Sequence, residues 1–176
     1  MMSPMLNPAK PAAIVVMGVS GSGKTEIGRR LAERLGWVFR DADEFHPAKN
    51  VAKMRAGIPL DDDDRGPWLE ALAAVLDTAT CAGPPLVLAC SALKRSHRAK
   101  LGLPHDQIRL VELDGSPELI RKRIEQRAGH FMPAALLDSQ LKALERPSPD
   151  EDAIVIDVSS EPDAIVRRVT AALGLP

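Results

Sequence analysis

The chain has 176 residues, 45% of them hydrophobic, which is enough for one well-buried core and predicts a single domain. Its 23 basic and 24 acidic residues are interspersed and give a formal net charge of -1. This balance argues against a nucleic-acid partner and against a polybasic membrane anchor, so any positive potential must be local and aimed at a small anionic ligand. No apolar run approaches the roughly 18 residues that a membrane span needs.

The first residues and the cysteines indicate a cellular compartment. Residues 1–11 hold three prolines and no apolar stretch of the signal-peptide type, so we expect a flexible tail ahead of a domain at residues 12–176. Cys81 and Cys90 lack metal-ligand spacing and are too few for a disulfide framework. We therefore expect a protein of the reduced cytoplasm.

Short apolar runs alternate with helical patterns along the chain. Ala12 to Met17 is a continuous apolar run that ends at a glycine, which is typical of a strand buried on both faces. Further strands are predicted at residues 37–39, 86–90, 108–113 and 153–158, and helices at 25–35, 47–56, from 67 onward, 117–127, 133–145 and 162–173. Strands separated by helices predict an α/β domain with a five-stranded parallel sheet and helices on both faces.

The strongest motif follows the first predicted strand and opens the first predicted helix. It fits G-x-x-x-x-G-K-[ST] in full and comprises Gly18, Val19, Ser20, Gly21, Ser22, Gly23, Lys24 and Thr25. Small residues let consecutive backbone N–H groups turn toward phosphate oxygens, and the helix adds its positive N-terminal end. Lys24 is expected to reach the β- and γ-phosphates of ATP, and the Thr25 hydroxyl to ligate Mg²⁺. The motif predicts a nucleotide-binding P-loop.

A phosphate cradle alone does not separate a kinase from a nucleotide-dependent switch. A GTPase would need a guanine-reading N/T-K-x-D string, and the sequence contains none. Residues 63–66 satisfy D-x-x-G, but they overlap an acidic run at 61–64 that we expect to be a loop before a helix starting near Pro67. We therefore favour a kinase and keep the switch as the alternative from another class.

Two aspartates, Asp41 and Asp43, follow the second predicted strand. In a parallel sheet the carboxyl ends of the strands share one edge, which also carries the P-loop. On an extended chain, side chains two residues apart face the same way. One carboxylate is therefore expected to serve the water shell of the metal and the other to meet an acceptor hydroxyl. The D-x-D pattern alone favours two solvated loop acids, and it is the residues that follow that favour the functional interpretation.

Longer residue patterns accompany the two aspartates. They comprise residues 41–47 (DADEFHP), Asn50, 53–54, Gly57, 59–61, 63–65, 67–68, 90–95, Arg98, 129–131 and 139–140. Together they closely resemble the gluconokinase family of small P-loop kinases, from the first strand to about Glu151. The resemblance implies ATP-dependent phosphorylation of D-gluconate at its C6 hydroxyl, an adenylate-kinase-like fold with a mobile lid, and a homodimer. Shikimate kinase, a wider relative that shares the D-x-D, is the alternative kinase.

The same resemblance implies roles for individual residues. Asp43 would lie nearest the acceptor hydroxyl, and Asp41 would help to hold magnesium. The candidates for contacts with gluconate are His46, Arg65, Arg98, His130 and Gln140. A sugar acid combines one carboxylate with many hydroxyls, so its pocket needs an arginine fork and several mixed donor–acceptor groups, which these side chains supply. For Arg98, a solvated helix face is the alternative.

Arg123 and Arg127 lie four residues apart, on one face of a predicted helix, before a loop bounded by Gly129 and Pro133. Phosphoryl transfer places charge on the transferring oxygens, and an arginine brought in by closure stabilises that charge. The resemblance implies a lid at about residues 123–135, in which Arg123 stacks on adenine and Arg127 meets the phosphates. A basic helix surface paired with nearby glutamates is the alternative.

Overall fold

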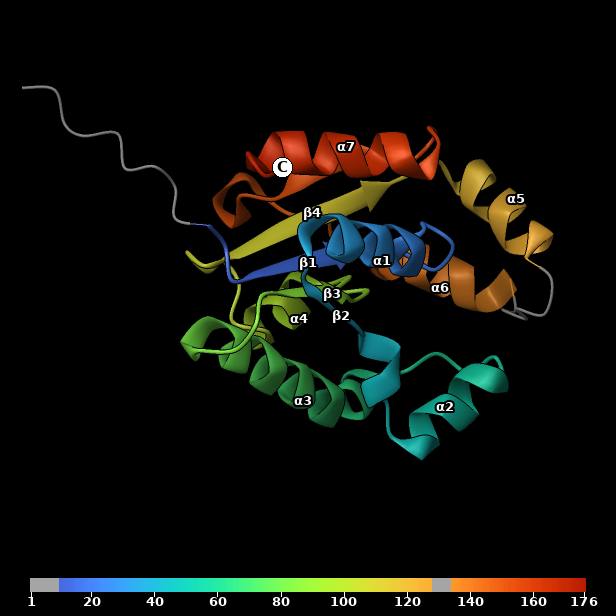
Figure 1. Ribbon diagram of the computed structural model, residues 1–176. Helices are drawn as coiled ribbons and strands as arrows, with labels where there is room; N and C mark the ends of the chain where they lie inside the picture. Colours follow the sequence, from blue (N-terminus) through green and yellow to red (C-terminus); the bar gives the residue numbers. More distant parts are fainter. Residues whose placement is uncertain (1–9, 128–133) are drawn as a thin grey trace, which may run out of the picture.

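Five parallel strands form one sheet in a computed structural model that describes residues 10–127 and 134–176 (Figure 1). The strand order is β2–β3–β1–β4–β5. The strands are β1 (Ala13–Met17), β2 (Val38–Asp41), β3 (Leu86–Ala89), β4 (Ile108–Asp114) and β5 (Ile154–Asp157). In the centre, Val15 of β1 pairs with Leu88 of β3 on one side and Leu110 of β4 on the other. The predicted five-stranded parallel sheet is confirmed.

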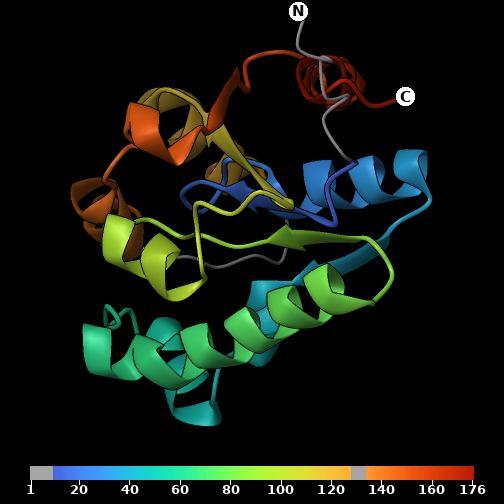
Figure 2. The same cartoon turned by 90° about the vertical axis from the view of Figure 1, so that its left-hand side faces the viewer.

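Helices cover both faces of this sheet, as Figures 1 and 2 show from two directions. One face is covered by α1 (Lys24–Leu35) and α7 (Pro162–Leu173), and the other by α3 (Asp62–Cys81), with α4 (Arg95–Lys100) beside it. Alternate residues of β1 divide between the two cores, because Ile14 and Val16 pack toward α1 and α7 whereas Val15 packs toward α3. Every residue of β1 is buried, which explains its continuous apolar run.

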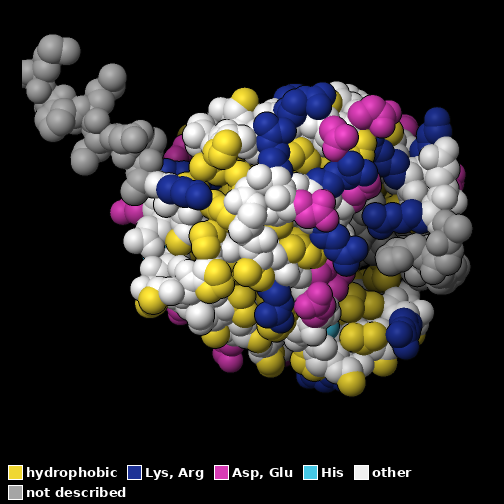
Figure 3. Space-filling view, in the orientation of Figure 1, with side chains coloured by type: hydrophobic (Ala, Val, Ile, Leu, Met, Phe, Trp, Pro, Cys, Tyr) yellow, Lys and Arg dark blue, Asp and Glu magenta, His cyan; other side chains and the backbone are white. Residues whose placement is uncertain are grey.

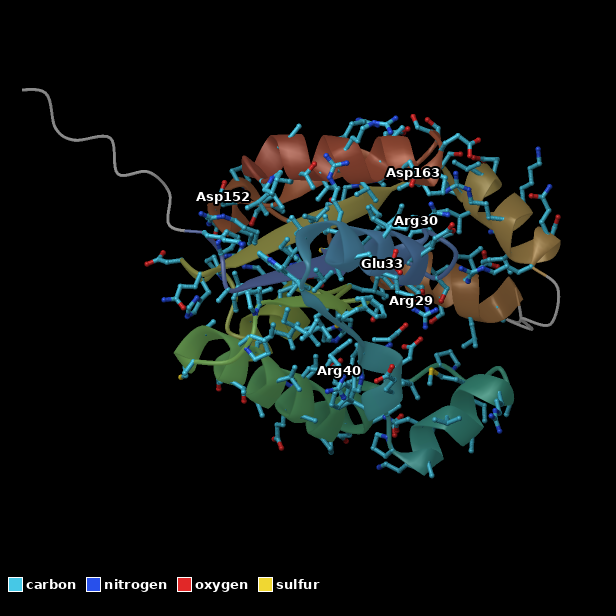
Figure 4. All side chains as sticks on the ribbon, viewed as in Figure 1. Arg29, Arg30, Glu33, Arg40, Asp152 and Asp163 are labelled. Atoms are coloured by element: carbon cyan, nitrogen blue, oxygen red, sulfur yellow. The ribbon has the colours of Figure 1, made fainter. Side chains whose placement is uncertain are left out.

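A polar link joins the two helices on the first face. Arg30 of α1 donates to Asp163 Oδ1 at the start of α7 over 2.8 Å, and Figure 4 shows the two side chains close together. Arg30 also bonds Glu26 one turn earlier in α1. All three side chains are well exposed, so this pair adds little stability and the apolar contacts beneath it hold the helices.

A smaller apolar cluster lies beyond the carboxyl ends of the strands. It combines Val19 after β1, Leu93 after β3, Ile120 of α5 (Pro117–Gln126) and Leu137 of α6 (Ala134–Ala143). The predicted start of α5 is confirmed, since Ser116 Oγ accepts from Leu119 N and Pro117 occupies the first helical position. The cluster holds the P-loop and the β3–α4 loop against α5 and α6.

The acidic run at residues 61–64 is not a loop, and that prediction was wrong. Asp61 is the N-cap of α3 and Asp64 closes a capping box, with Asp64 N donating to Asp61 Oδ1 over 2.8 Å and Asp61 N donating to Asp64 Oδ2 over 3.1 Å. The carboxylates lie at the positive end of the helix, which stabilises them there. The helix thus starts five residues before Pro67, and the D-x-x-G at 63–66 is helical.

Two predicted segments fall partly outside the described residues. Of the expected tail at residues 1–11, only 10 and 11 are described, and Pro11 is buried. The next residue is already bonded to the domain, because Ala12 N donates to Gln107 O over 2.7 Å. Of the expected lid, residues 128–133 lie outside the described part, so its mobility stays a prediction. No helix within the described ranges combines the length and the apolar character that a membrane span requires.

Candidate active site

A cavity of about 630 Å³ lies at the carboxyl edge of the sheet. It is bounded by the P-loop, by the short helices η1 (Ala42–Phe45) and α2 (Ala48–Arg55), by the beginning of α3, and by parts of α5 and α6. Figure 3 shows basic and acidic side chains at the rim of a hollow in the surface. The predicted site residues that line the cavity are Ser20, Gly21, Gly23, Lys24, Thr25, Asp41, Asp43, His46, Arg65, Arg127 and Gln140.

The P-loop has the backbone that a phosphate cradle needs. Gly21 and Gly23 have φ angles of 82° and 96°, a region that residues with a side chain rarely adopt. A Cβ atom at Gly21 would also lie 2.7 Å from Ile124 Cγ1 of α5. Gly23 precedes α1 without a side-chain cap, so the first N–H groups of this helix are free to face an anion. Ser22 Oγ is buried beside them and has no hydrogen-bond partner in the described part of the chain.

The Thr25 hydroxyl and the Asp41 carboxylate meet at the end of β2. Thr25 Oγ1 donates to Asp41 Oδ2 over 2.7 Å. Magnesium in phosphoryl-transfer sites takes one or two protein carboxylates, substrate phosphates and waters. A hydroxyl and a carboxylate oxygen next to a P-loop therefore fit this ion, although residues 10–127 and 134–176 contain no cluster of three or more His, Cys, Asp or Glu residues that would hold a metal.

The D-x-D at residues 41–43 does not continue the strand, so the expected extended chain was wrong. The backbone turns into η1 after Asp41, because Asp41 Oδ1 accepts from Asp43 N over 3.0 Å and caps the helix. Trp68 Nε1 donates to Ala42 O over 2.7 Å and holds the turn from the α3 side. Both carboxylates still line the cavity, one at the end of β2 and the other on η1.

The Lys24 ammonium lies among charges of both signs. Its Nζ donates to Val19 O over 3.1 Å. Burial lowers the pKa of Lys24, Asp43 and Asp41 act in the opposite direction, and Arg127 adds to the lowering. Bound phosphate would favour the charged form of the Lys24 ammonium in the same way as the two carboxylates.

The opposite wall of the cavity offers hydrogen-bonding groups on an apolar background. His46 stacks on Trp68 with ring centroids 4.3 Å apart and an interplanar angle of 12°. Arg65 uses one N–H to bond Leu60 O over 2.7 Å, which orients the rest of its fork. Val51 and Met54 of α2 form the apolar part of the wall. This combination suits a small polar molecule with a carbon skeleton.

Arg98 does not line the cavity, and neither prediction for it was right. Its side chain is fully buried, and it bonds both oxygens of Glu151 over 2.6 and 3.1 Å. Arg98 Nη1 also donates to the carbonyls of Ala92 and Leu93 over 2.8 and 3.2 Å. The hydrogen bonds to Ala92 and Leu93 hold the β3–α4 loop in place, and Ser91 and Leu93 of this loop line the cavity. Arg98 therefore supports a loop of the cavity wall and does not line the cavity itself.

Gln140 reaches the cavity, but its side chain contacts the P-loop. Gln140 Oε1 accepts from Ser20 N over 2.7 Å, and Nε2 donates to Ser20 Oγ over 3.3 Å. These bonds tie α6 to the phosphate cradle. The sequence predicted a contact of Gln140 with gluconate and did not predict this contact with the P-loop. Arg123 is not among the cavity-lining residues, because it donates to Val158 O after β5. His130 lies outside the described residues.

Ser91 and Trp68 also line the cavity, and the sequence predicted no role for either of them. Ser91 lies two residues after the carboxyl end of β3. This position indicates a site residue, because all parallel strands of a sheet end at the edge where the site lies. Trp68 gave no comparable signal, because an indole on a helix is usually a core residue.

Comparisons with known proteins show the family to which the chain belongs. The profile of the AAA domain family matches residues 14–147. The chain is 46% identical to the gluconokinase of Gluconobacter oxydans strain 621H, covering 91% of this chain and 90% of the relative. It is 48% identical to the thermosensitive gluconokinase of Escherichia coli K12, covering 85% and 80%. The chain belongs to the gluconokinase family. A gluconokinase crystal structure from Sinorhizobium meliloti 1021 matches with a TM-score of 0.84 at 44% identity, covering 93% of this chain and 92% of that one.

Membership of the gluconokinase family confirms the resemblance that the residue patterns indicated. The likeness to other P-loop kinases is more distant. A shikimate kinase from Bacteroides thetaiotaomicron is 19% identical with a TM-score of 0.67, and this similarity extends to the fold alone.

Proposed function

We propose that this protein transfers the γ-phosphoryl group of ATP to the C6 hydroxyl of D-gluconate, giving 6-phospho-D-gluconate and ADP. The observation that carries the proposal is that one cavity is lined both by P-loop residues, Lys24 and Thr25 among them, and by Asp43, His46 and Arg65. Its volume lies within the range of small-molecule sites. Relatives at 46 and 48% identity carry the name gluconokinase, whereas the shikimate kinase at 19% shares only the fold, so gluconate is the favoured acceptor.

The residues of the cavity divide into a phosphoryl-donor side and an acceptor side. The P-loop N–H groups and Lys24 would hold the β- and γ-phosphates. Thr25 and Asp41 would hold Mg²⁺, which when bound neutralises developing charge on the phosphates. Arg127, at the rim of the cavity, would stabilise the transferring oxygens, and Arg123 would stack on adenine. These two roles and the closing lid stay predictions, as do the homodimer and the cytoplasmic location.

On the acceptor side, Asp43 would orient the C6 hydroxyl and take its proton. The hydroxyl oxygen then forms a bond to the γ-phosphorus while the bond to the β,γ-bridging oxygen breaks, and ADP leaves with that electron pair. Arg65 would pair with the gluconate carboxylate through its remaining fork. His46 would bond an oxygen of the sugar acid from the stacked position on Trp68.

A coupled assay of ADP release tests the proposal directly. With ATP and magnesium, gluconate should stimulate ADP release strongly, and shikimate at the same concentration should not. Stimulation by shikimate alone would indicate the alternative function, that of a shikimate kinase. Slow ADP release that no acceptor changes would indicate a nucleotide-binding switch.

Replacing Gln140 by alanine should raise the KM for ATP about five- to tenfold and change the KM for gluconate much less. The reason is that the side chain bonds Ser20 of the phosphate cradle twice, and losing such a bond costs about 1 kcal/mol. Initial rates with each substrate varied in turn measure this difference. Lys142→Ala, an exposed change on the same helix, is the control. A rise in the KM for gluconate alone would contradict this role and indicate that Gln140 contacts gluconate.

A further inference from the structure

Asn50, near the start of α2, has no exposed surface although it is a polar residue. Its Nδ2 donates to Asp64 O over 2.8 Å and lies 3.3 Å from His46 Nδ1. A carbonyl oxygen only accepts hydrogen bonds, so the atom that faces Asp64 O must be the amide nitrogen. This contact fixes the orientation of the amide. The nitrogen carries two hydrogens, one for Asp64 O and one for His46 Nδ1.

The Asp64 carbonyl that orients Asn50 is itself held firmly. The Asp64 carboxylate accepts from Lys53 Nζ over 2.7 Å and from Asp61 N over 3.1 Å within the capping box of α3. Asp64 is buried, so solvent does not compete strongly for these bonds. A chain of contacts therefore runs from the start of α3 through Asn50 to the imidazole of His46.

This arrangement decides where the proton of His46 resides. A neutral imidazole has one N–H donor and one acceptor nitrogen, so an accepting Nδ1 leaves the proton on Nε2. Burial lowers the pKa of His46, with Arg65 acting in the same direction and Asp43 opposing it, which favours the neutral ring at neutral pH. Trp68 fixes the plane of the ring by stacking, and Asn50 fixes its protonation.

We propose that Asn50 is a positioning residue that fixes His46 as the Nε2–H tautomer, so that His46 presents a hydrogen-bond donor to the cavity. The ring lines the cavity, and no group in the described ranges bonds its Nε2. The ligand of this donor is an oxygen of the phosphoryl acceptor, and this step rests on the proposed function. His46 and Arg65 then supply donors to the sugar acid, while Asp43 supplies the acceptor that the reacting hydroxyl needs.

The wild-type protein alone tests the tautomer, without any substrate. In a long-range ¹H–¹⁵N spectrum of protein labelled at histidine nitrogens, His46 should show a deprotonated Nδ1 and a protonated Nε2 above its pKa. His46→Gln assigns the signal. His97 and His105 are internal references, because Nδ1 of each accepts from a backbone N–H, that of Lys94 over 3.4 Å and that of Gln107 over 3.0 Å. A proton on Nδ1 of His46 would overturn the proposal.

The variant Asn50→Asp keeps the shape of the side chain and replaces its donors with carboxylate oxygens. His46 should then become protonated at Nδ1 and its pKa should rise, while the signals of His97 and His105 stay in place. An unchanged His46 pattern in a folded variant would contradict the proposal, and if the variant does not fold, the wild-type spectrum decides. These spectra hold or fail whether or not gluconate is the substrate.

Kinetics then connect the tautomer to substrate binding. In Asn50→Asp, the KM for gluconate should rise about tenfold, the loss of about one hydrogen bond, while the KM for ATP changes less than about twofold. Equal changes in both KM values would indicate a general disturbance of the cavity and contradict a role on the acceptor side. A protein that phosphorylates another acceptor would show the same split for that acceptor, which separates this inference from the choice of gluconate.

Discussion

Lys24→Ala is expected to fold normally and to phosphorylate gluconate with a kcat at least ~10³-fold lower than that of the wild-type protein. Lys24 is the P-loop cation, and the charge of a transferring phosphoryl group is stabilised mainly by such preorganised positive groups. Among the residues that the structure describes, its side chain makes one hydrogen bond, to Val19 O, so its removal should cost little stability. Steady-state kinetics measures the loss of kcat, and circular dichroism measures the fold.

The matched control for Lys24 is Lys100→Ala, which removes the same charge from the exposed end of α4. It should retain wild-type kcat. Near-wild-type activity of a folded Lys24→Ala protein would contradict the assignment of this P-loop as the site that binds the transferring phosphoryl group.

Asp43→Asn is expected to lower kcat by ~10²–10⁴-fold if the carboxylate acts as the general base, and to leave the Kd of ATP nearly unchanged. The side chain is exposed on η1, lines the cavity and has no hydrogen-bond partner among the residues described, so it is free to meet an acceptor hydroxyl. A loose transition state asks little of a base, and a loss near the lower limit would mean that Asp43 mainly orients the hydroxyl.

Glu44→Gln tests whether the effect belongs to Asp43 or to any acid of η1. Glu44 is exposed, pairs with Arg40 over 3.6 Å, and does not line the cavity, so its variant should behave like the wild type. Full kcat with weakened ATP binding in Asp43→Asn would show that the roles of Asp41 and Asp43 are reversed.

The parts of the protein that local sequence determines could be predicted. The P-loop depends on glycines at positive φ between a buried strand and a helix, all within about ten residues of each other. The strands β1 and β3 are continuous apolar runs, whereas β2, β4 and β5 combine apolar with charged residues, and helical patterns separate all five. The start of α3 was also a local signal, but four consecutive aspartates concealed the capping box between Asp61 and Asp64.

The features that sequence did not predict depend on partners far apart in the chain. The burial of Arg98 requires Glu151, which the fold brings to it from 53 residues away. Gln140 contacts Ser20 across 120 residues, a partner that neither the resemblance nor the residue type indicated. The turn after Asp41 was missed because the second aspartate was assumed to continue the strand, whereas a side-chain cap ends the strand there.

Identification of the product tests the central claim most directly. The protein should be incubated with ATP, magnesium and D-gluconate, and the mixture analysed by ³¹P nuclear magnetic resonance. We predict one new phosphomonoester signal coupled to the two protons on C6, formed in equal amount with ADP and absent with Lys24→Ala. Inorganic phosphate without an ester, or an ester at another carbon, would contradict the account of this site as a gluconate 6-kinase.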